Sequence, residues 1–191
     1  DPRIRCACVS CFPDVTDVIE AEEDRDAVAA LAREVALRAV TAMKRMRAGE
    51  GERLCNDLLN RVTTVESIAG KIDVRAPFVV EEYRTKLSER IESMLGGVEV
   101  DRTRLATEVA LFADKASINE ELVRLASHIT EMRKVLGADE AAGRRLDFIV
   151  QEMNREFNTI GSKANDAEIT SLVIAGKGEI EKIREQVQNI E

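Results

Sequence analysis

One apolar stripe with helical spacing runs from residue 24 to residue 73 and constrains the fold more than any other feature of the sequence. Its members recur at steps of three and four residues, which places them on one side of an α-helix; they are Val28, Leu31, Val35, Ala39, Met43, Met46, Leu54, Leu58, Val62 and Val65. Gly49 and Gly51 interrupt the helix-forming residues, but the stripe keeps its phase across them. We predict one long helix over residues 24–73, which at about 1.5 Å per residue is too long for one small domain to cover. Part of it is expected to project or to pack on another subunit.

The composition favours helices and excludes several classes of protein. Three prolines in 191 residues favour helix over sheet, and the 45% hydrophobic share is enough to build a core. No apolar run approaches the roughly 18–20 residues that would span a bilayer, and no secretory signal opens the chain. The net charge of −8 argues against a generic polyanion binder but leaves room for a nucleic-acid channel lined locally with Arg and Lys. The sequence contains no P-loop, dinucleotide-binding, zincin or serine-hydrolase motif.

Five shorter helices are predicted after the long one, so the chain is expected to be all-α. Pro77 fits the first turn of a second helix, which is expected to fold back on residues 54–72 as a helical hairpin. A third helix is expected near residues 101–115. Ser117 and Glu120 form an S-x-x-E capping-box pattern, which predicts the start of a fourth helix.

The last two predicted helices form a C-terminal bundle with the fourth. The fifth begins at Asp139 or Gly143, and the sixth is capped near Asp166. Both carry apolar residues at alternating steps of four and three, which is typical of an antiparallel pair or of an oligomer seam. Gly176 and Gly178 lie inside the sixth helix, where each costs about 1 kcal/mol relative to Ala. The sequence offers no reason for either glycine.

Three of the four cysteines are clustered near the N-terminus. Cys6, Cys8 and Cys11 form a C-x-C-x-x-C pattern, and Cys55 stands apart. A structural zinc site usually takes four ligands, often from C-x-x-C pairs. Because the cluster has no evident fourth ligand, we interpret it as a reduced N-terminal segment of a cytosolic protein, with a metal site as the alternative.

Carboxylates and amides flank the apolar stripe of the fifth predicted helix. One side carries Asp147, Gln151, Asn154 and Asn158, and the other carries Glu152 and Glu156, one turn apart. Two carboxylates at this spacing can share a hard cation such as Mg²⁺ or Mn²⁺. The alternative is a solvated polar face on which Arg155 pairs with a neighbouring glutamate.

The single histidine, His128, lies beside the apolar stripe of the fourth predicted helix and shares a face with Glu121 and Arg124. A carboxylate together with an imidazole suits a transition-metal site. A lone histidine in such a position is more often a partly buried structural residue, so both interpretations stay open. On the third helix, Glu108 flanks the apolar residues and could face inward.

Two long blocks near the C-terminus resemble the YicC-like family of bacterial proteins. They read RLATEVALFADKASINEELVRLASHITEMRKVL and GRRLDFIVQEMNREFNTIGSKANDAEIT, the second followed by EIEKIREQVQNIE. Three earlier segments are similar to the middle region of that family, namely FPDVTDVIEAEED, MKRMRAGEGERLCNDLL and RAPFVVEEYRTKLSERI. The similarity runs in order over residues 12–191, and QEMNREFNTIGSKA is its most specific block.

The resemblance implies a cytoplasmic, metal-dependent endoribonuclease that acts on single-stranded RNA, in a family earlier described as stress-induced. It also implies a ring-like hexamer and an N-terminal α/β region before the helical part. Because the chain lacks a starting Met and most of that region, we expect it to be a fragment. The expected domains are residues 1–23, a remnant or linker of the missing region; residues 24–98, the long helix and hairpin; and residues 99–191, the C-terminal helical domain with the family signature.

The residues that match the family pattern concentrate on the third, fourth and fifth helices. They are Glu108, Asp114, Glu120, Glu121, Arg124, His128, Asp147, Glu152, Asn154, Arg155, Glu156, Asn158 and Lys163. Ser117 stands where the family commonly has Asp, so a ligand at that position in relatives would be missing here.

These positions lead to a hypothesis for the site. The expected metal ligands for Mg²⁺ or Mn²⁺ are Glu108, Glu121, His128, Glu152 and Glu156, with His128, Glu152 and Glu156 also catalytic. The expected RNA contacts are Arg124, Arg155 and Lys163 at phosphates, Asn154 and Asn158 at sugar or base edges, and Arg144 and Arg145 further out.

The rival hypothesis is non-catalytic. In it the helical part is an oligomerisation and RNA-gripping scaffold, and the chemistry belongs to the missing N-terminal region. A helical adaptor for another protein is a weaker third interpretation. Convergence of Glu121, His128, Glu152 and Glu156 within a few ångströms favours the metal site, whereas separate, Arg-paired faces favour the scaffold.

Overall fold

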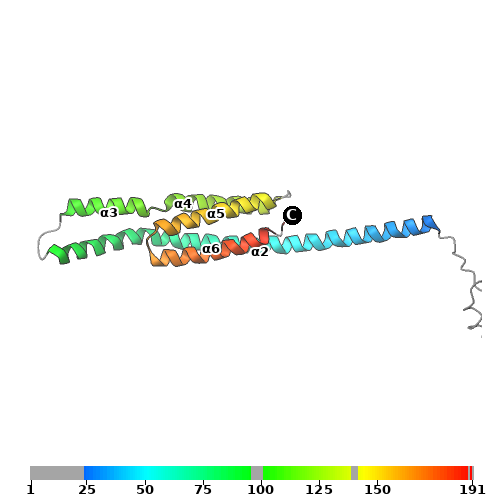
Figure 1. The fold of residues 1–191 in the computed structure, drawn as a ribbon, viewed down its shortest axis with the longest axis horizontal. Coiled ribbons are helices and arrows are strands. Elements are labelled where there is room, and N and C mark those ends of the chain that lie inside the picture. The colour runs from blue at the N-terminus through cyan, green and yellow to red at the C-terminus, as the bar shows by residue number, and fades with distance from the viewer. Residues whose placement is uncertain (1–23, 96–100, 139–141, 189, 191) are drawn as a thin grey trace, which may run out of the picture. The chain divides into compact units, whose positions relative to one another are not determined.

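The computed structural model describes residues 24–95, 101–138, 142–188 and 190. Within these ranges the chain is all-α and contains no strand, which confirms the predicted fold class; the helices are α2 (Arg25–Leu95), α3 (Arg102–Ala116), α4 (Asn119–Leu136), α5 (Gly143–Lys163) and α6 (Ala167–Val187) (Figure 1). The chain divides into two units, residues 1–49 and residues 50–191. The Cys6, Cys8 and Cys11 cluster lies outside the described residues, and the domain boundaries expected after residues 23 and 98 stay predictions.

The long helix predicted over residues 24–73 is present, but it does not end there. α2 continues through Pro77 to Leu95, so the helical hairpin predicted between residues 54–72 and a helix beginning at Pro77 was wrong. A proline inside a helix removes one backbone hydrogen bond and costs about 3 kcal/mol. Ile72 and Val79 are seven residues apart and therefore lie on one side of α2, and both are buried in the core. Apolar packing before and after Pro77 offsets its local cost.

A hairpin does form, but further along the chain than predicted, between α2, which ends at Leu95, and α3, which begins at Arg102 (Figure 1). The rings of Tyr83 on α2 and Phe112 on α3 stack with centroids 3.8 Å apart and an interplanar angle of 9°. No residue of α3 is fully buried, since this helix contributes only partly buried side chains such as Phe112 to the core. α3 is therefore a lightly anchored helix beside the C-terminal part of α2.

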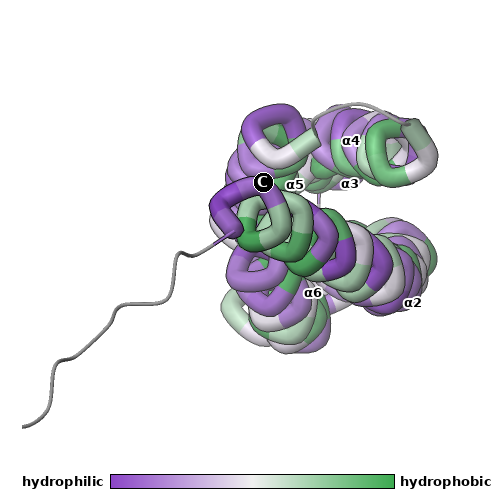
Figure 2. The backbone as a smooth tube through the Cα atoms, turned by 90° about the vertical axis from the view of Figure 1, so that its right-hand side faces the viewer, coloured by the Kyte–Doolittle hydropathy of each residue, from purple (hydrophilic) through white to green (hydrophobic). Residues whose placement is uncertain are grey.

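The core of residues 50–191 is shared by α2, α4, α5 and α6. α5 packs against both α4 and α6, which confirms the predicted pairing of the two heptad helices. The largest fully buried side chains come from all four helices and include Leu58, Ile72, Leu125, Met132, Met153, Phe157 and Ile180. Figure 2 shows hydrophobic and hydrophilic stretches alternating along the helices, as expected when each buries one side. No helix among the described residues combines the length and apolarity needed to cross a membrane.

The helix starts agree only in part with the sequence pattern. Asp166 caps α6 as predicted, with its Oδ1 accepting a hydrogen bond from the Ile169 N–H at 2.8 Å. The capping box at Ser117 and Glu120 was wrong: α4 begins after Ile118, which makes no side-chain capping bond. Ile118 is buried in the core, whereas Ser117 ends α3 with an extended backbone. Burial of Ile118 therefore decides where α4 starts.

Arg75 connects α2 to the turn between α5 and α6. Its guanidinium pairs with Asp166 at 2.8 Å, Glu82 at 2.6 Å and Glu168 at 3.2 Å. The hydrogen bond from Arg75 lowers the pKa of Asp166 more than burial raises it, and the Ile169 N–H adds to the lowering. Because the folded-state pKa is depressed, the stabilisation is present above the ordinary carboxyl pKa and is lost as the pH falls through the folded-state value.

Asp166→Asn separates the ion pair from the helix cap, because Asn also accepts the capping hydrogen bond. We expect this variant to melt at a lower temperature than the wild type at pH 7. The difference should shrink as the pH falls below the ordinary carboxyl range and through the depressed pKa of Asp166, because the wild type then loses the charge that Arg75 pairs with. Thermal unfolding followed by circular dichroism across this pH range measures both effects. A melting difference that is constant with pH would contradict the argument.

The structure supplies the missing reason for one of the two glycines in α6. A Cβ at Gly176 would lie 2.4 Å from Cε1 of the buried Phe157, whereas a Cβ at Gly178 would meet nothing within 4 Å. We expect Gly176→Ala to lower the free energy of unfolding by about 1–2 kcal/mol, because overpacking exceeds the gain in helix propensity. Gly178→Ala is the matched control and should gain up to about 1 kcal/mol. Urea denaturation of both variants checks the pair, and equal stabilisation by both would contradict it.

Candidate metal and nucleic-acid site

The candidate site lies where α4 and α5 run side by side in opposite directions. Pairs across this contact join Glu121 to Lys163 and Glu131 to Arg145, so residue numbers rise on α4 as they fall on α5. Buried apolar residues hold the two helices together, chiefly Leu125, Ile129 and Met132 from α4 and Ile149, Met153 and Phe157 from α5. Polar residues next to these positions are thereby turned toward the edge of the helix contact.

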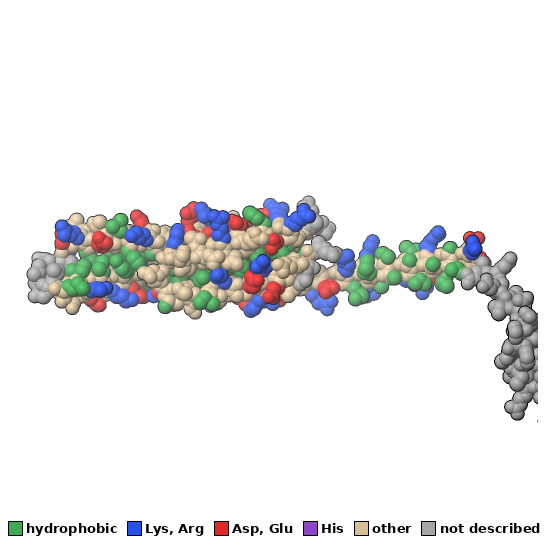
Figure 3. All heavy atoms as spheres, viewed as in Figure 1, with side chains coloured by type: hydrophobic (Ala, Val, Ile, Leu, Met, Phe, Trp, Pro, Cys, Tyr) green, Lys and Arg blue, Asp and Glu red, His purple; other side chains and the backbone are tan. Residues whose placement is uncertain are grey.

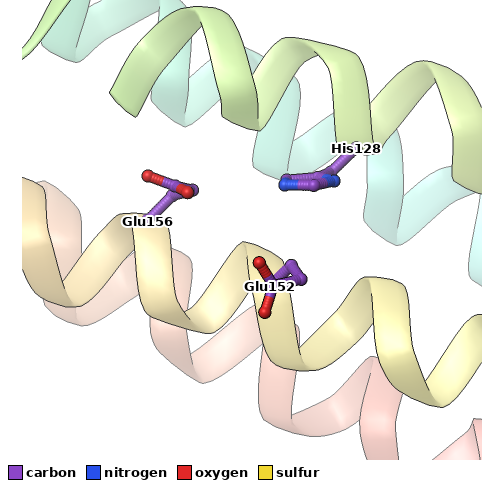
Figure 4. Close-up of side chains that lie close together, drawn as sticks. All are labelled: His128, Glu152 and Glu156. Atoms are coloured by element: carbon purple, nitrogen blue, oxygen red, sulfur yellow. The ribbon is translucent and has the colours of Figure 1, made fainter. Parts of the chain in front are cut away.

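His128, Glu152 and Glu156 converge at this edge. His128 comes from α4 and the two glutamates, one turn apart, from α5, and their side chains point toward one another (Figure 4). One ligand atom from each residue lies within 4.8 Å of the others. Of the four residues whose convergence the sequence predicted, these three come together.

The three donors fit a divalent cation. Two ligands on opposite sides of an ion with bonds of about 2.1 Å are about 4.2 Å apart. Small side-chain rotations would therefore bring all three atoms to one ion. One imidazole with two carboxylates suits Mn²⁺ or another transition cation better than Mg²⁺, which prefers oxygen ligands.

Glu156 is buried, with 4% of its surface exposed, and burial of a carboxylate is costly unless a positive charge compensates it. Within the described residues the one cationic side chain within 4 Å of this carboxylate is Arg124, at 3.9 Å. Arg124 is half exposed and also pairs with Glu120. The charge of Glu156 is thus only loosely balanced by the protein.

Glu121 lies two turns before His128 on α4 and is 3% exposed. Its Oε1 accepts a hydrogen bond from Lys163 at 2.7 Å, and its Oε2 is buried without a hydrogen-bond partner in the described structure. Burial by itself would raise the pKa of Glu121, but the hydrogen bond from Lys163, a backbone N–H and the charges of Lys163 and Arg124 together lower it. Glu121 is therefore held as a carboxylate beside the group formed by His128, Glu152 and Glu156, and is not part of it.

The other predicted site residues lie around this group or away from it. Glu108 is exposed on α3 and outside the group. Arg155 is largely exposed and approaches Glu152 at 3.9 Å. Lys163, predicted to contact phosphate, is engaged with Glu121.

Asn154 and Asn158 lie toward α6 and form a small polar chain. Asn158 donates to Asn154 Oδ1 at 3.4 Å, and Lys177 of α6 donates to Asn158 Oδ1 at 2.7 Å. Lys177 was missed by sequence reasoning, because no helical spacing links it to Asn158 and only the packing of α5 on α6 brings them together. Arg145 pairs with Glu131, and Arg144 is exposed.

The described residues form a helical bundle, and an imidazole and two carboxylates gather at the edge of two of its packed helices. This arrangement defines the class of protein: an all-α protein with a candidate divalent-cation site. The model of the family described as "Endoribonuclease YicC-like, C-terminal" matches residues 72–191, which include every residue of the candidate site. The chain belongs to this YicC-like endoribonuclease family, as the sequence resemblance predicted.

Two curated relatives carry the name "Probable endoribonuclease YicC". The protein of Clostridioides difficile (strain 630) is 44% identical over 184 residues, which cover 96% of this chain and 63% of the relative. The protein of Haemophilus influenzae (strain ATCC 51907 / DSM 11121 / KW20 / Rd) is 37% identical over 146 residues, or 76% of this chain and 50% of the relative. The chain thus spans between half and two thirds of the length of these relatives.

The buried pair of Glu121 and Lys163 is testable apart from any metal. Lys163→Met leaves a buried carboxylate without its cation and should cost about 1–2 kcal/mol of unfolding free energy, the lower part of the range because Lys163 is partly exposed. Adding Glu121→Gln to Lys163→Met should recover part of that loss. Lys182→Met, which removes an exposed lysine whose partner Glu179 keeps a second cation in Arg61, is the control and should change stability by less than about 0.5 kcal/mol. Equal effects of the two lysine substitutions would contradict a structural role for the buried pair.

Proposed function

We propose that this chain carries the metal-binding part of an endoribonuclease that cleaves single-stranded RNA. The observation that supports it most is the convergence of His128, Glu152 and Glu156 within the region matched by the endoribonuclease family. The names of both relatives point to the same reaction class. Homo-oligomeric assembly as a ring-like hexamer, and a cytoplasmic location, are further parts of the proposal that rest on the family resemblance.

In this proposal, His128, Glu152 and Glu156 would hold the divalent cation. When bound, such an ion polarises a phosphoryl oxygen and lowers the pKa of a coordinated water. The packing of α4 on α5 fixes the directions of the three side chains before an ion binds. Loosely compensated negative charge at Glu156 favours cation binding, since the ion would supply the missing positive charge.

The basic side chains around this group would hold the RNA backbone. Arg124 lies beside Glu156, and Arg155 lies beside Glu152, so both stand next to the proposed ion and keep exposed guanidinium groups. A guanidinium in this position can bind a phosphate through two hydrogen bonds. Lys163 would instead act through Glu121, which it holds as a carboxylate beside the proposed ion.

Two of the predicted roles receive less support from the geometry. Glu108 is exposed on α3, away from the other proposed ligands, so a role in metal binding would need a different arrangement of α3. Asn154 and Asn158 lie on the α6 side of α5, where Lys177 joins them. They would contact the RNA only if the strand extends past the edge of α5 toward α6.

The rival proposal, a non-catalytic scaffold, is disfavoured by the same geometry. A scaffold needs separate polar faces with satisfied pairs, whereas here a buried carboxylate is turned toward an imidazole and a second carboxylate. The scaffold proposal would be favoured if the catalytic residues lay in the part of the relatives that this chain does not cover.

The decisive experiment removes the paired carboxylates. We expect Glu152→Gln with Glu156→Gln to reduce Mn²⁺-dependent cleavage of labelled single-stranded RNA about 100-fold, the factor that corresponds to several kcal/mol of lost charge stabilisation. The matched control is Glu181→Gln with Glu185→Gln, which has the same charge change and spacing on α6 and should keep the parental rate. EDTA should abolish cleavage by the parent protein.

Metal binding is measured on the same proteins by Mn²⁺ titration followed by electron paramagnetic resonance. The parent and the control should bind Mn²⁺ equally, and the Glu152 and Glu156 variant should bind it at least about 10-fold more weakly. Parental cleavage and parental Mn²⁺ affinity in that variant would refute the site. Lost metal binding without any cleavage by the parent would favour the scaffold instead.

A further inference from the structure

Phe148 is an exposed aromatic side chain on the helix that supplies two of the proposed metal ligands. It is 61% exposed, whereas the neighbouring residues Ile149 and Val150 are buried in the core. Most other aromatic side chains of the described residues are engaged with the protein, since Tyr83 stacks on Phe112 and Phe157 is fully buried. Single exposed apolar residues are common on protein surfaces, so exposure alone assigns no role to Phe148.

The position of Phe148 relative to the candidate metal site is more informative. Phe148 lies four residues before Glu152, which places the two side chains on one face of α5, about 6 Å apart along its axis. Glu152 points toward His128 and Glu156 (Figure 4). Nucleotides of a stacked strand follow one another at about 3.4 Å. A strand with one phosphate at the proposed ion would therefore bring the base of a nearby nucleotide, one or two steps along, to Phe148.

Two guanidinium groups lie on the same face of α5, one before Phe148 and one after it. Arg144, Phe148, Glu152 and Arg155 follow one another at steps of four, four and three residues, which keeps them on one side of the helix. Arg144 is exposed and has no acidic partner in the part of the chain that the structure describes. Arg155 is also largely exposed and approaches Glu152 only at 3.9 Å. Both cations are therefore accessible to phosphates of a bound strand.

This face suits a nucleic-acid strand better than a partner helix. Phe148 is the one exposed large hydrophobic side chain of α5, which is described over its whole length, so the helix lacks the exposed apolar stripe that a partner helix would cover. Figure 3 shows basic, acidic and hydrophobic side chains interspersed on the face of α4 and α5 that it presents. One aromatic ring between cationic side chains is the combination on which proteins stack the bases of a single strand.

We propose that Phe148 stacks against a base of single-stranded RNA beside the phosphate held at the metal site, and that Arg144 binds a phosphate further along the same strand. This inference rests on the proposed function and adds a residue that positions the substrate through a base. Every base has a π-face, so the contact accepts all four bases. It excludes paired RNA, because bases inside a duplex are not free to stack on a side chain.

Binding to RNA with and without bases tests the stacking contact. Oligouridylate and an abasic oligomer of the same length are titrated into the whole chain with EDTA present, so that metal-dependent cleavage does not interfere. We expect Phe148→Ala to bind oligouridylate about 10-fold more weakly than the parent and the abasic oligomer equally well. Phe148→Trp, which keeps an aromatic ring, should restore the affinity for oligouridylate.

The matched control is Phe78→Ala, which removes a phenylalanine that is 56% exposed on α2. This variant should bind both oligomers as the parent does. Parental affinity of Phe148→Ala for oligouridylate would overturn the proposal. So would an equal loss of affinity for both oligomers, because the effect would then come from the surface or the assembly of the protein and not from a base.

Steady-state cleavage with Mn²⁺ separates substrate positioning from chemistry. A stacking contact away from the reacting phosphate is made in the ground state and in the transition state alike. We therefore expect Phe148→Ala to raise KM about 10-fold with kcat retained. A lower kcat at an unchanged KM contradicts the stacking role.

The Mn²⁺ titration of the parent decides the metal proposal separately, since Phe148 offers no ligand atom to the ion. A parent that binds no Mn²⁺ and cleaves no RNA refutes the proposed function, whereas the comparison of the two oligomers still decides the stacking contact. Parental Mn²⁺ affinity together with base-independent RNA binding refutes the stacking contact and leaves the metal site in place.

Discussion

The packing of α5 between α4 and α6 is the interaction on which the rest of the structure depends. Phe157 is fully buried and fits against α6 only because Gly176 has no Cβ, while Met153 and Ile149 are buried in the same core. This packing fixes the rotation of α5 about its axis. Once that rotation is fixed, the residues one position before Met153 and Phe157, which are Glu152 and Glu156, must lie on the side toward α4. The geometry of the candidate site is thus a consequence of core packing.

The same packing explains why the site carries unbalanced charge. Glu121 and Glu156 are both drawn into the edge of the α4–α5 contact, where burial of a carboxylate costs several kcal/mol unless it is paired. Lys163 compensates Glu121 directly at 2.7 Å, whereas Arg124 lies 3.9 Å from Glu156 and also serves Glu120. Glu156 therefore does not stabilise the fold at this position, because its buried charge has no close cation. A bound cation would complete its charge balance, which is the strongest physical argument for a metal at this place.

Sequence patterns predicted the helices well because a stripe with steps of three and four residues can be buried in only one way. They failed where packing overrides a local rule: Pro77 is kept inside α2 by buried residues on either side, and Ile118 displaces the capping box at Ser117. The spacing of Glu152 and Glu156 was readable from one helix. Their approach to His128, and that of Lys177 to Asn158, depends on how two helices are aligned against each other, which no spacing within one helix contains. The family resemblance supplied the grouping instead: it put His128, Glu152 and Glu156 among the expected ligands, together with Glu108 and Glu121, which lie outside the observed group.

The candidate metal site draws its ligands from two helices of one copy, whose contact is well packed, so it requires no second copy to complete the donor set. Dissociation of an oligomer would therefore leave the three ligands in position, and any loss of cleavage would have to arise from RNA binding. Comparing the Mn²⁺ affinity with the rate of RNA cleavage in a dissociated sample separates these two contributions.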